Sequence, residues 1–211
     1  SAEICFRKAY ELRMRGTRIE VVPDILMNLA DANNRLGKLD IGAAWYRRAL
    51  LMCDSLHMAS TKKPPIYYGL AQVYVTMRDF EQCDYYYNLA GESYDNMLPY
   101  EKYIYLNNRG TSYYYREDYQ TAIKYFQKVI DLVEGYDDMS FELNLGRLNL
   151  GDCYLQLNMV DLAVKYINEC QLFFEEMGVS TALYYIDTQK IELALLQKDF
   201  QEARRLLSES V

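Results

Sequence analysis

A pattern of small and large apolar residues recurs along the chain about every 40 residues. A small residue occurs five times at intervals of 39 to 41 residues, and a large apolar residue follows four positions later in every copy. Two helices approach closely only where small side chains face each other, and large side chains then fill the space one turn away. The pattern therefore predicts stacked helical hairpins. The small residues are Gly42, Cys83, Ala122, Ala163 and Ala203, and the large ones are Tyr46, Tyr87, Phe126, Ile167 and Leu207.

The first half of each copy repeats as well. A small residue is followed three positions later by a tyrosine in three copies, and Asn33 takes the tyrosine's place in the first copy. With 4 prolines and 10 glycines in 211 residues, little interrupts the apolar spacing that is typical of helices. Prolines lie where the first helices of several hairpins should begin, at positions where a missing backbone N–H costs least. The small residues are Ala30, Ala71, Gly110 and Gly151, the tyrosines are Tyr74, Tyr113 and Tyr154, and the prolines are Pro23, Pro64, Pro65 and Pro99.

The recurring order of small, aromatic, small, large and small residues resembles that of the tetratricopeptide repeat family. The usual repeat has about 34 residues, so the copies here resemble extended forms such as those of bacterial sensor and regulator proteins. The resemblance implies an all-α fold, a right-handed α-α superhelix (solenoid) of about 11 helices, that binds proteins or peptides and is not an enzyme. We expect a single solenoid domain over residues 1–211, with a half repeat at 1–18 and repeats at about 19–60, 61–98, 99–137, 138–178 and 179–211.

The two ends of the sequence predict a piece of a longer protein. Residues 1 to about 15 match the second helix of a hairpin whose first helix is missing. At the other end Leu206, Leu207 and Val211 would be exposed, whereas terminal repeats usually present a polar outer face. A natural half-repeat cap carrying Arg13, Arg15 and Arg18 is the alternative. The apolar C-terminal helix also leaves open a structural role, in which terminal helices mediate homodimer formation.

In this family the first helices line the concave surface, and the resemblance places one row of residues there: Asn28, Gly69, Asn108, Asn149 and Gln189. Four of the five are carboxamides, which offer both a donor and an acceptor to the backbone of an extended peptide. Alternatively, these amides bond to a neighbouring helix. Further predicted groove residues are Asp31, Arg35, Tyr68, Gln72, Asn107, Tyr114 and Asp152; because Arg35 is the one basic residue among them, clamping of a C-terminal carboxylate is disfavoured.

Charge and motifs narrow the function further. A formal net charge of -7 disfavours binding of nucleic acid or of an anionic membrane surface. The sequence contains no phosphate-binding loop, dinucleotide-binding motif or HExxH motif, so we expect no catalytic residue, no metal and no cofactor. Five cysteines without a CxxC pair favour a reducing compartment such as the cytoplasm, and an extracytoplasmic (periplasmic) sensor domain remains the alternative.

Overall fold

The computed structural model describes residues 2–16, 19–58 and 62–209. Over this part the chain forms eleven α-helices and short 3-10 turns, with no strand. It divides into two compact units, an N-terminal unit, Ser1–Leu98, and a C-terminal unit, Pro99–Val211. The N-terminal unit contains α1 (Ala2–Met14), α2 (Val22–Arg35), α3 (Leu39–Ser55), α4 (Pro64–Thr76) and α5 (Phe80–Gly91). The C-terminal unit contains α6 (Pro99–Tyr114), α7 (Tyr119–Val133), α8 (Ser140–Gln156), α9 (Val160–Met177), α10 (Ser180–Leu196) and α11 (Phe200–Glu209).

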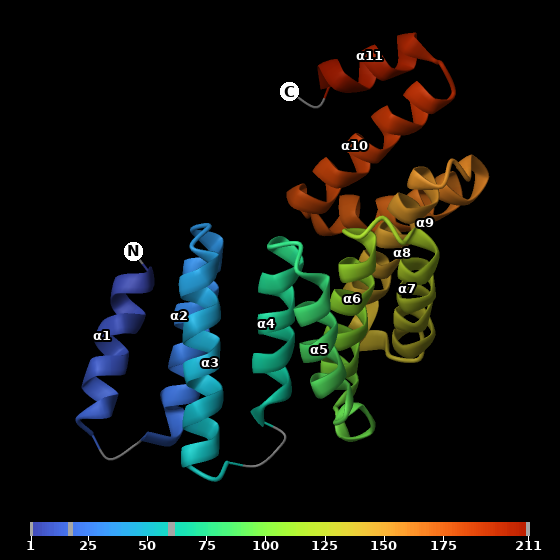
Figure 1. Ribbon diagram of the computed structural model, residues 1–211. Helices are drawn as coiled ribbons and strands as arrows, with labels where there is room; N and C mark the ends of the chain where they lie inside the picture. Colours follow the sequence, from blue (N-terminus) through green and yellow to red (C-terminus); the bar gives the residue numbers. More distant parts are fainter. Residues whose placement is uncertain (1, 17–18, 59–61, 210–211) are drawn as a thin grey trace. The chain divides into compact units, whose positions relative to one another are not determined.

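Consecutive helices form hairpins, and each of the five expected repeats holds one of them. The pairs are α2 with α3 and α4 with α5 in the N-terminal unit, and α6 with α7, α8 with α9 and α10 with α11 in the C-terminal unit. Helix α1 packs on α2, α3 packs on α4, and α7 packs on α8 (Figure 1). The all-α prediction with about 11 helices is confirmed.

The same tight turn closes all five hairpins. The second residue after each first helix, or the third after α6, has a positive φ, between 56° and 72°. The following N–H donates to the carbonyl five residues earlier, at 2.8 to 3.0 Å, which is the Schellman arrangement that satisfies helix-end carbonyls. Asp79 and Asp118 then cap the next helix by accepting the N–H of Gln82 and Thr121, each at 3.1 Å. The positive-φ residues are Gly37, Arg78, Glu117, Asn158 and Lys198.

The core follows the repeat read from the sequence. All five small residues of the second helices are buried, and so are four of the five large residues that follow them. Leu207 on α11 is the exception, with 58 % of its surface exposed. The predicted exposure of Leu207 is therefore confirmed, whereas that of Leu206 is wrong, because Leu206 is half-buried. Val211 and Arg18 lie outside the described residues. Four of the cysteines are buried as free thiols, and Cys5 on α1 is exposed.

The recurring tyrosines of the first helices stack on tyrosines of the second helices. Ring centroids lie 5.5 to 5.6 Å apart in three hairpins, with nearly parallel planes. Such offset aromatic pairs add about 0.5–1.5 kcal/mol beyond their buried area. In the first hairpin the buried Asn33 replaces the tyrosine and donates to the Leu29 carbonyl at 2.8 Å. The stacked pairs are Tyr74 with Tyr86, Tyr113 with Tyr125 and Tyr154 with Tyr166.

Candidate functional site

In the N-terminal unit the predicted groove residues lie on α2 and α4. Asn28, Asp31 and Arg35 are exposed on α2, while Tyr68 and Gln72 are half-buried on α4. One of them contacts a buried phenol, because the hydroxyl of Tyr46 on α3 donates a hydrogen bond to Asp31 Oδ1.

Gly69 on α4 explains how the Tyr46 ring is accommodated. A Cβ atom at Gly69 would lie 2.5 Å from the ring carbon Cζ of Tyr46, so the missing side chain leaves room for the phenol. Burial, followed by the negative charge of Asp31, raises the pKa of Tyr46 well above its usual range. Gly69, the one residue of the predicted row without a carboxamide, therefore has a packing role.

In the C-terminal unit a bond between two amides joins adjacent first helices. Asn149 Nδ2 on α8 donates to Asn107 Oδ1 on α6 at 2.9 Å. The sequence placed Asn108 in the row and Asn107 beside it, whereas the structure pairs Asn107 with Asn149. Neighbouring residues on a helix point about 100° apart, so an offset of one position changes which amide faces the next helix.

Gln189 on α10 continues this connection to the next hairpin. Its side chain is only 6 % exposed, and its Nε2 donates to the carbonyl of Leu148 on α8 at 3.1 Å. The donor of Gln189 is thus used between helices, which is the alternative that the sequence left open for this row. Its oxygen Oε1 is buried and has no hydrogen-bond partner.

Tyr114 and Asp152 form a second polar connection, between α6 and α8. Their side chains are hydrogen-bonded, and Asp152 also accepts a hydrogen bond from Gln156. Burial is the largest effect on Asp152 and raises the pKa of its carboxyl, with a further contribution from the charge of Glu192 on α10; the two hydrogen bonds oppose the shift. Gln156 Nε2 in turn donates to Glu192 Oε1 at 3.1 Å, so polar contacts extend from α6 across α8 to α10.

A cavity of about 260 Å³ lies among these helices. Typical small-molecule pockets measure roughly 300–1,000 Å³, so this one is suited to a side chain rather than to a whole cofactor. It contains four predicted site residues, Tyr114, Asn149, Asp152 and Gln189. The complete lining is Thr111, Tyr114, Tyr115, Phe126, Leu145, Leu148, Asn149, Asp152, Tyr185 and Gln189.

Leu145 is a wall residue that the sequence reading missed. It lies four positions before Asn149 and seven before Asp152, so all three share one face of α8. This helical spacing was the signal that could have identified it. Phe126 was recognised only as a core residue, yet its ring also forms part of the wall.

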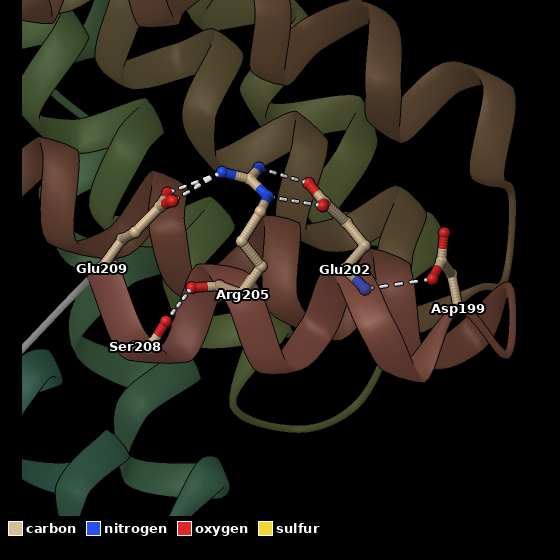
Figure 2. Close-up of polar contacts among 5 residues, drawn as sticks. All are labelled: Asp199, Glu202, Arg205, Ser208 and Glu209. Carbon is tan, nitrogen blue, oxygen red and sulfur yellow. Dashed lines mark hydrogen bonds and ion pairs between the residues drawn. The ribbon is translucent and has the colours of Figure 1, made fainter.

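The terminal helix α11 has a charged face and an apolar face. Figure 2 shows Arg205 between Glu202 and Glu209, with guanidinium-to-carboxylate distances of 2.6 to 2.8 Å. These hydrogen bonds raise the pKa of Arg205, and those that Arg205 donates to Glu202 lower the pKa of Glu202. Phe200 and Leu207, seven residues apart and hence on one side of the helix, are both exposed.

The described residues contain no group of three or more His, Cys, Asp or Glu side chains that could hold a metal ion. Nor do they include a helix with the length and apolar character needed to cross a membrane.

Comparison with known proteins identifies a repeat family in part of the chain. Two family models, both described as tetratricopeptide repeat, match residues 103–136 and 146–172, which cover the hairpins α6–α7 and α8–α9. These two segments are therefore tetratricopeptide repeats, and such repeats form interaction scaffolds.

Among curated proteins, the chain is similar to the anaphase-promoting complex subunit CDC16 of Saccharomyces cerevisiae, with 26 % identity over 163 residues. That match covers 75 % of this chain and 18 % of the yeast protein, so the chain spans less than a fifth of its relative's length.

Solved structures share the fold along nearly the whole chain. BtubC from P. vanneervenii matches with a TM-score of 0.74 and 19 % identity, covering 99 % of this chain and 86 % of that one. NprR, solved in complex with its cognate peptide NprX, matches with a TM-score of 0.70 and 14 % identity, covering 99 % of this chain and 58 % of that one. At these identities the likeness establishes the fold alone, a solenoid of tetratricopeptide hairpins.

Proposed function

We propose that α6, α8 and α10 bind an extended peptide segment of a partner protein. The cavity carries this proposal, because three successive first helices contribute side chains to it and polar contacts connect them. Tyr115 and Tyr185 are exposed and line the same cavity. Tyrosine provides a large contact area at low entropic cost, and interface hot spots are rich in it.

The role of the whole protein follows as a second part of the proposal. We infer that the chain serves as the sensing or docking domain of a larger signalling or transcription-regulatory protein. Support comes from the structural likeness to NprR, which was solved with a bound peptide. The residues on α2 and α4, including Asn28, Asp31, Arg35, Tyr68 and Gln72, remain a prediction for a binding surface on the N-terminal unit.

Two adjacent tyrosines of α10 offer a matched test of the site. Tyr184 and Tyr185 are 63 % and 61 % exposed, and of the two only Tyr185 lines the cavity. Peptides selected by display against the intact chain should bind Tyr185→Ala at least about tenfold more weakly, which is the loss of a typical hot spot. Tyr184→Ala should keep its affinity within about threefold. Equal effects of the two substitutions, in titrations followed by calorimetry, would contradict the proposed site.

Self-association through α11 is the second candidate function. The exposed Phe200 and Leu207 on one side of this helix favour it. Light scattering across protein concentrations would show a dimer that Leu207→Glu abolishes. A mass equal to one chain at every concentration would remove this candidate.

A further inference from the structure

The lining of the cavity between α6, α8 and α10 includes two residues with acceptor oxygens, Asp152 and Gln189. Each of the two carboxamides in its wall uses one N–H within the protein, since Asn149 donates to Asn107 and Gln189 donates to the Leu148 carbonyl. Because the carbonyl of Leu148 can only accept, the Gln189 amide must be turned with Nε2 toward it, and Oε1 is left buried and without a partner. An unpaired buried acceptor costs free energy, and a donor supplied by a ligand would remove that cost.

Like the unpaired acceptor of Gln189, the charge of the cavity lining favours a ligand that donates hydrogen bonds. Asp152 belongs to the lining, and no Lys, Arg or His does. The charged side chain that influences Asp152 most is another carboxylate, Glu192, which raises the pKa of Asp152 further. Burial disfavours the ionised form of Asp152 and the lining contains no cation, so a cation supplied by a ligand would favour that form.

The volume and the lining residues of the cavity indicate which kind of cationic group would fit. About 260 Å³ suits one long side chain. Leu145 and Leu148 would contact an aliphatic stem, while the tyrosine rings at Tyr115 and Tyr185 offer faces to a cationic head.

We propose that this cavity receives the arginine or lysine side chain of the bound peptide, with the cationic head on Asp152 and the Gln189 oxygen. The inference rests on the proposed peptide-binding function and names the chemistry that the site selects. The partner is accordingly a basic segment, which also suits the net charge of -7.

The test begins with a randomised peptide library displayed against the intact chain. Selected peptides should be enriched in Arg or Lys at one position. Replacing that residue by its neutral isostere, citrulline for Arg or acetyl-lysine for Lys, should weaken binding at least about tenfold, as expected for loss of one member of a partly desolvated charge pair.

Asp152→Asn provides the second arm, because it removes the charge while keeping an oxygen that can accept from Tyr114. The variant should bind the basic and the neutral peptide equally, whereas Asp161→Asn on α9, an exposed control, should still discriminate between them. Far-ultraviolet circular dichroism would confirm that both variants fold.

Two results would overturn the inference. One is a selection without any enrichment of basic residues, and the other is an Asp152→Asn variant that discriminates as strongly as the wild type. If Tyr185→Ala still weakened binding in either case, the peptide site would stand and only its cationic specificity would fail. If Tyr185→Ala had no effect as well, the proposed function would fail too.

Discussion

At the scale of single residues, the ionised carboxyl of Asp152 is unfavourable for folding and is also the proposed contact for a cationic ligand. Its pKa is raised by burial despite hydrogen bonds from Tyr114 and Gln156, so its ionised form is disfavoured in the folded chain. Folded protein therefore binds this proton more tightly than unfolded protein does. The contribution of Asp152 to the free energy of unfolding is largest below its ordinary pKa of 3.8 and is lost as the pH rises through the raised value.

A neutral residue in place of Asp152 should remove this pH-dependent loss of stability. We expect Asp152→Asn to raise the melting temperature at pH 7 and to have a smaller effect near about pH 2, well below the ordinary pKa of 3.8, where the carboxyl is protonated in both states. Thermal unfolding followed by circular dichroism at the two pH values would measure this, with the exposed Asp161→Asn as the control. A lower melting temperature for Asp152→Asn at pH 7 would contradict the account.

Single residues also show which features of the site could not be predicted from the sequence. Alignment of the copies placed Asn149 and Asp152 correctly on the face of one helix, because helical spacing fixes which residues share a face. It could not choose between Asn107 and Asn108, since a shift of one position rotates a side chain by about 100°. The direction of the Gln189 amide was equally inaccessible, because it depends on the Leu148 carbonyl of another helix.

At the scale of elements, close approach of paired helices depends on residues without a side chain. A Cβ at Gly110 on α6 would lie 2.7 Å from Cε1 of the buried Phe126 on α7. The sequence predicted that small residues allow this close approach, because a small residue recurs at the position of Gly110 in four copies.

We expect Gly110→Ala to destabilise the protein by about 1–3 kcal/mol, the usual cost of overpacking a core. Gly135→Ala is the control, since an added Cβ there would meet nothing within 4 Å, and it should change stability by less than about 0.5 kcal/mol. Urea unfolding would measure both. If the two variants were equally stable, the close approach of α6 and α7 would not be limiting.

The hairpin turns were located from the sequence, but their backbone conformation was not. Arg78, Glu117 and Lys198 have positive φ values that favour glycine, whereas Gly37 and Asn158 have residue types that would have indicated this conformation. The Schellman bonds of the turn fix the conformation whatever the side chain.

Removing a glycine and introducing a glycine at this turn position should change the free energy of unfolding in opposite directions. Gly37→Ala should cost about 1 kcal/mol, because a left-handed backbone is unfavourable for a residue with a Cβ. Glu117→Gly should be neutral or should stabilise by up to about 1 kcal/mol, since relief of that strain is partly offset by the entropy of glycine. Chemical denaturation of the two variants would check the signs, and stabilisation by Gly37→Ala would refute the turn geometry.

At the scale of the molecule, repeat proteins owe their stability to contacts between neighbours, so helices with few buried residues open first. Within the described residues, α1 has no buried side chain and α11 has only Ala203, whereas α8 has seven: Asn144, Gly146, Leu148, Leu150, Gly151, Cys153 and Leu155. We expect amide hydrogen exchange to be fastest in α1 of the N-terminal unit and in α11 of the C-terminal unit. Exchange should be slowest in α8. Protection of α11 equal to that of α8 would show that burial does not set the order in which the helices open.

The central claim is that the cavity between α6, α8 and α10 binds a peptide. Methyl NMR of the intact chain, titrated with a display-selected peptide, tests it most directly, because Leu145 and Leu148 line the cavity while Leu172 is exposed on α9. The account predicts that the Leu145 and Leu148 methyl signals shift as the peptide binds and that the Leu172 signals do not. Saturable binding that shifts Leu172 and leaves Leu145 and Leu148 unchanged would contradict it.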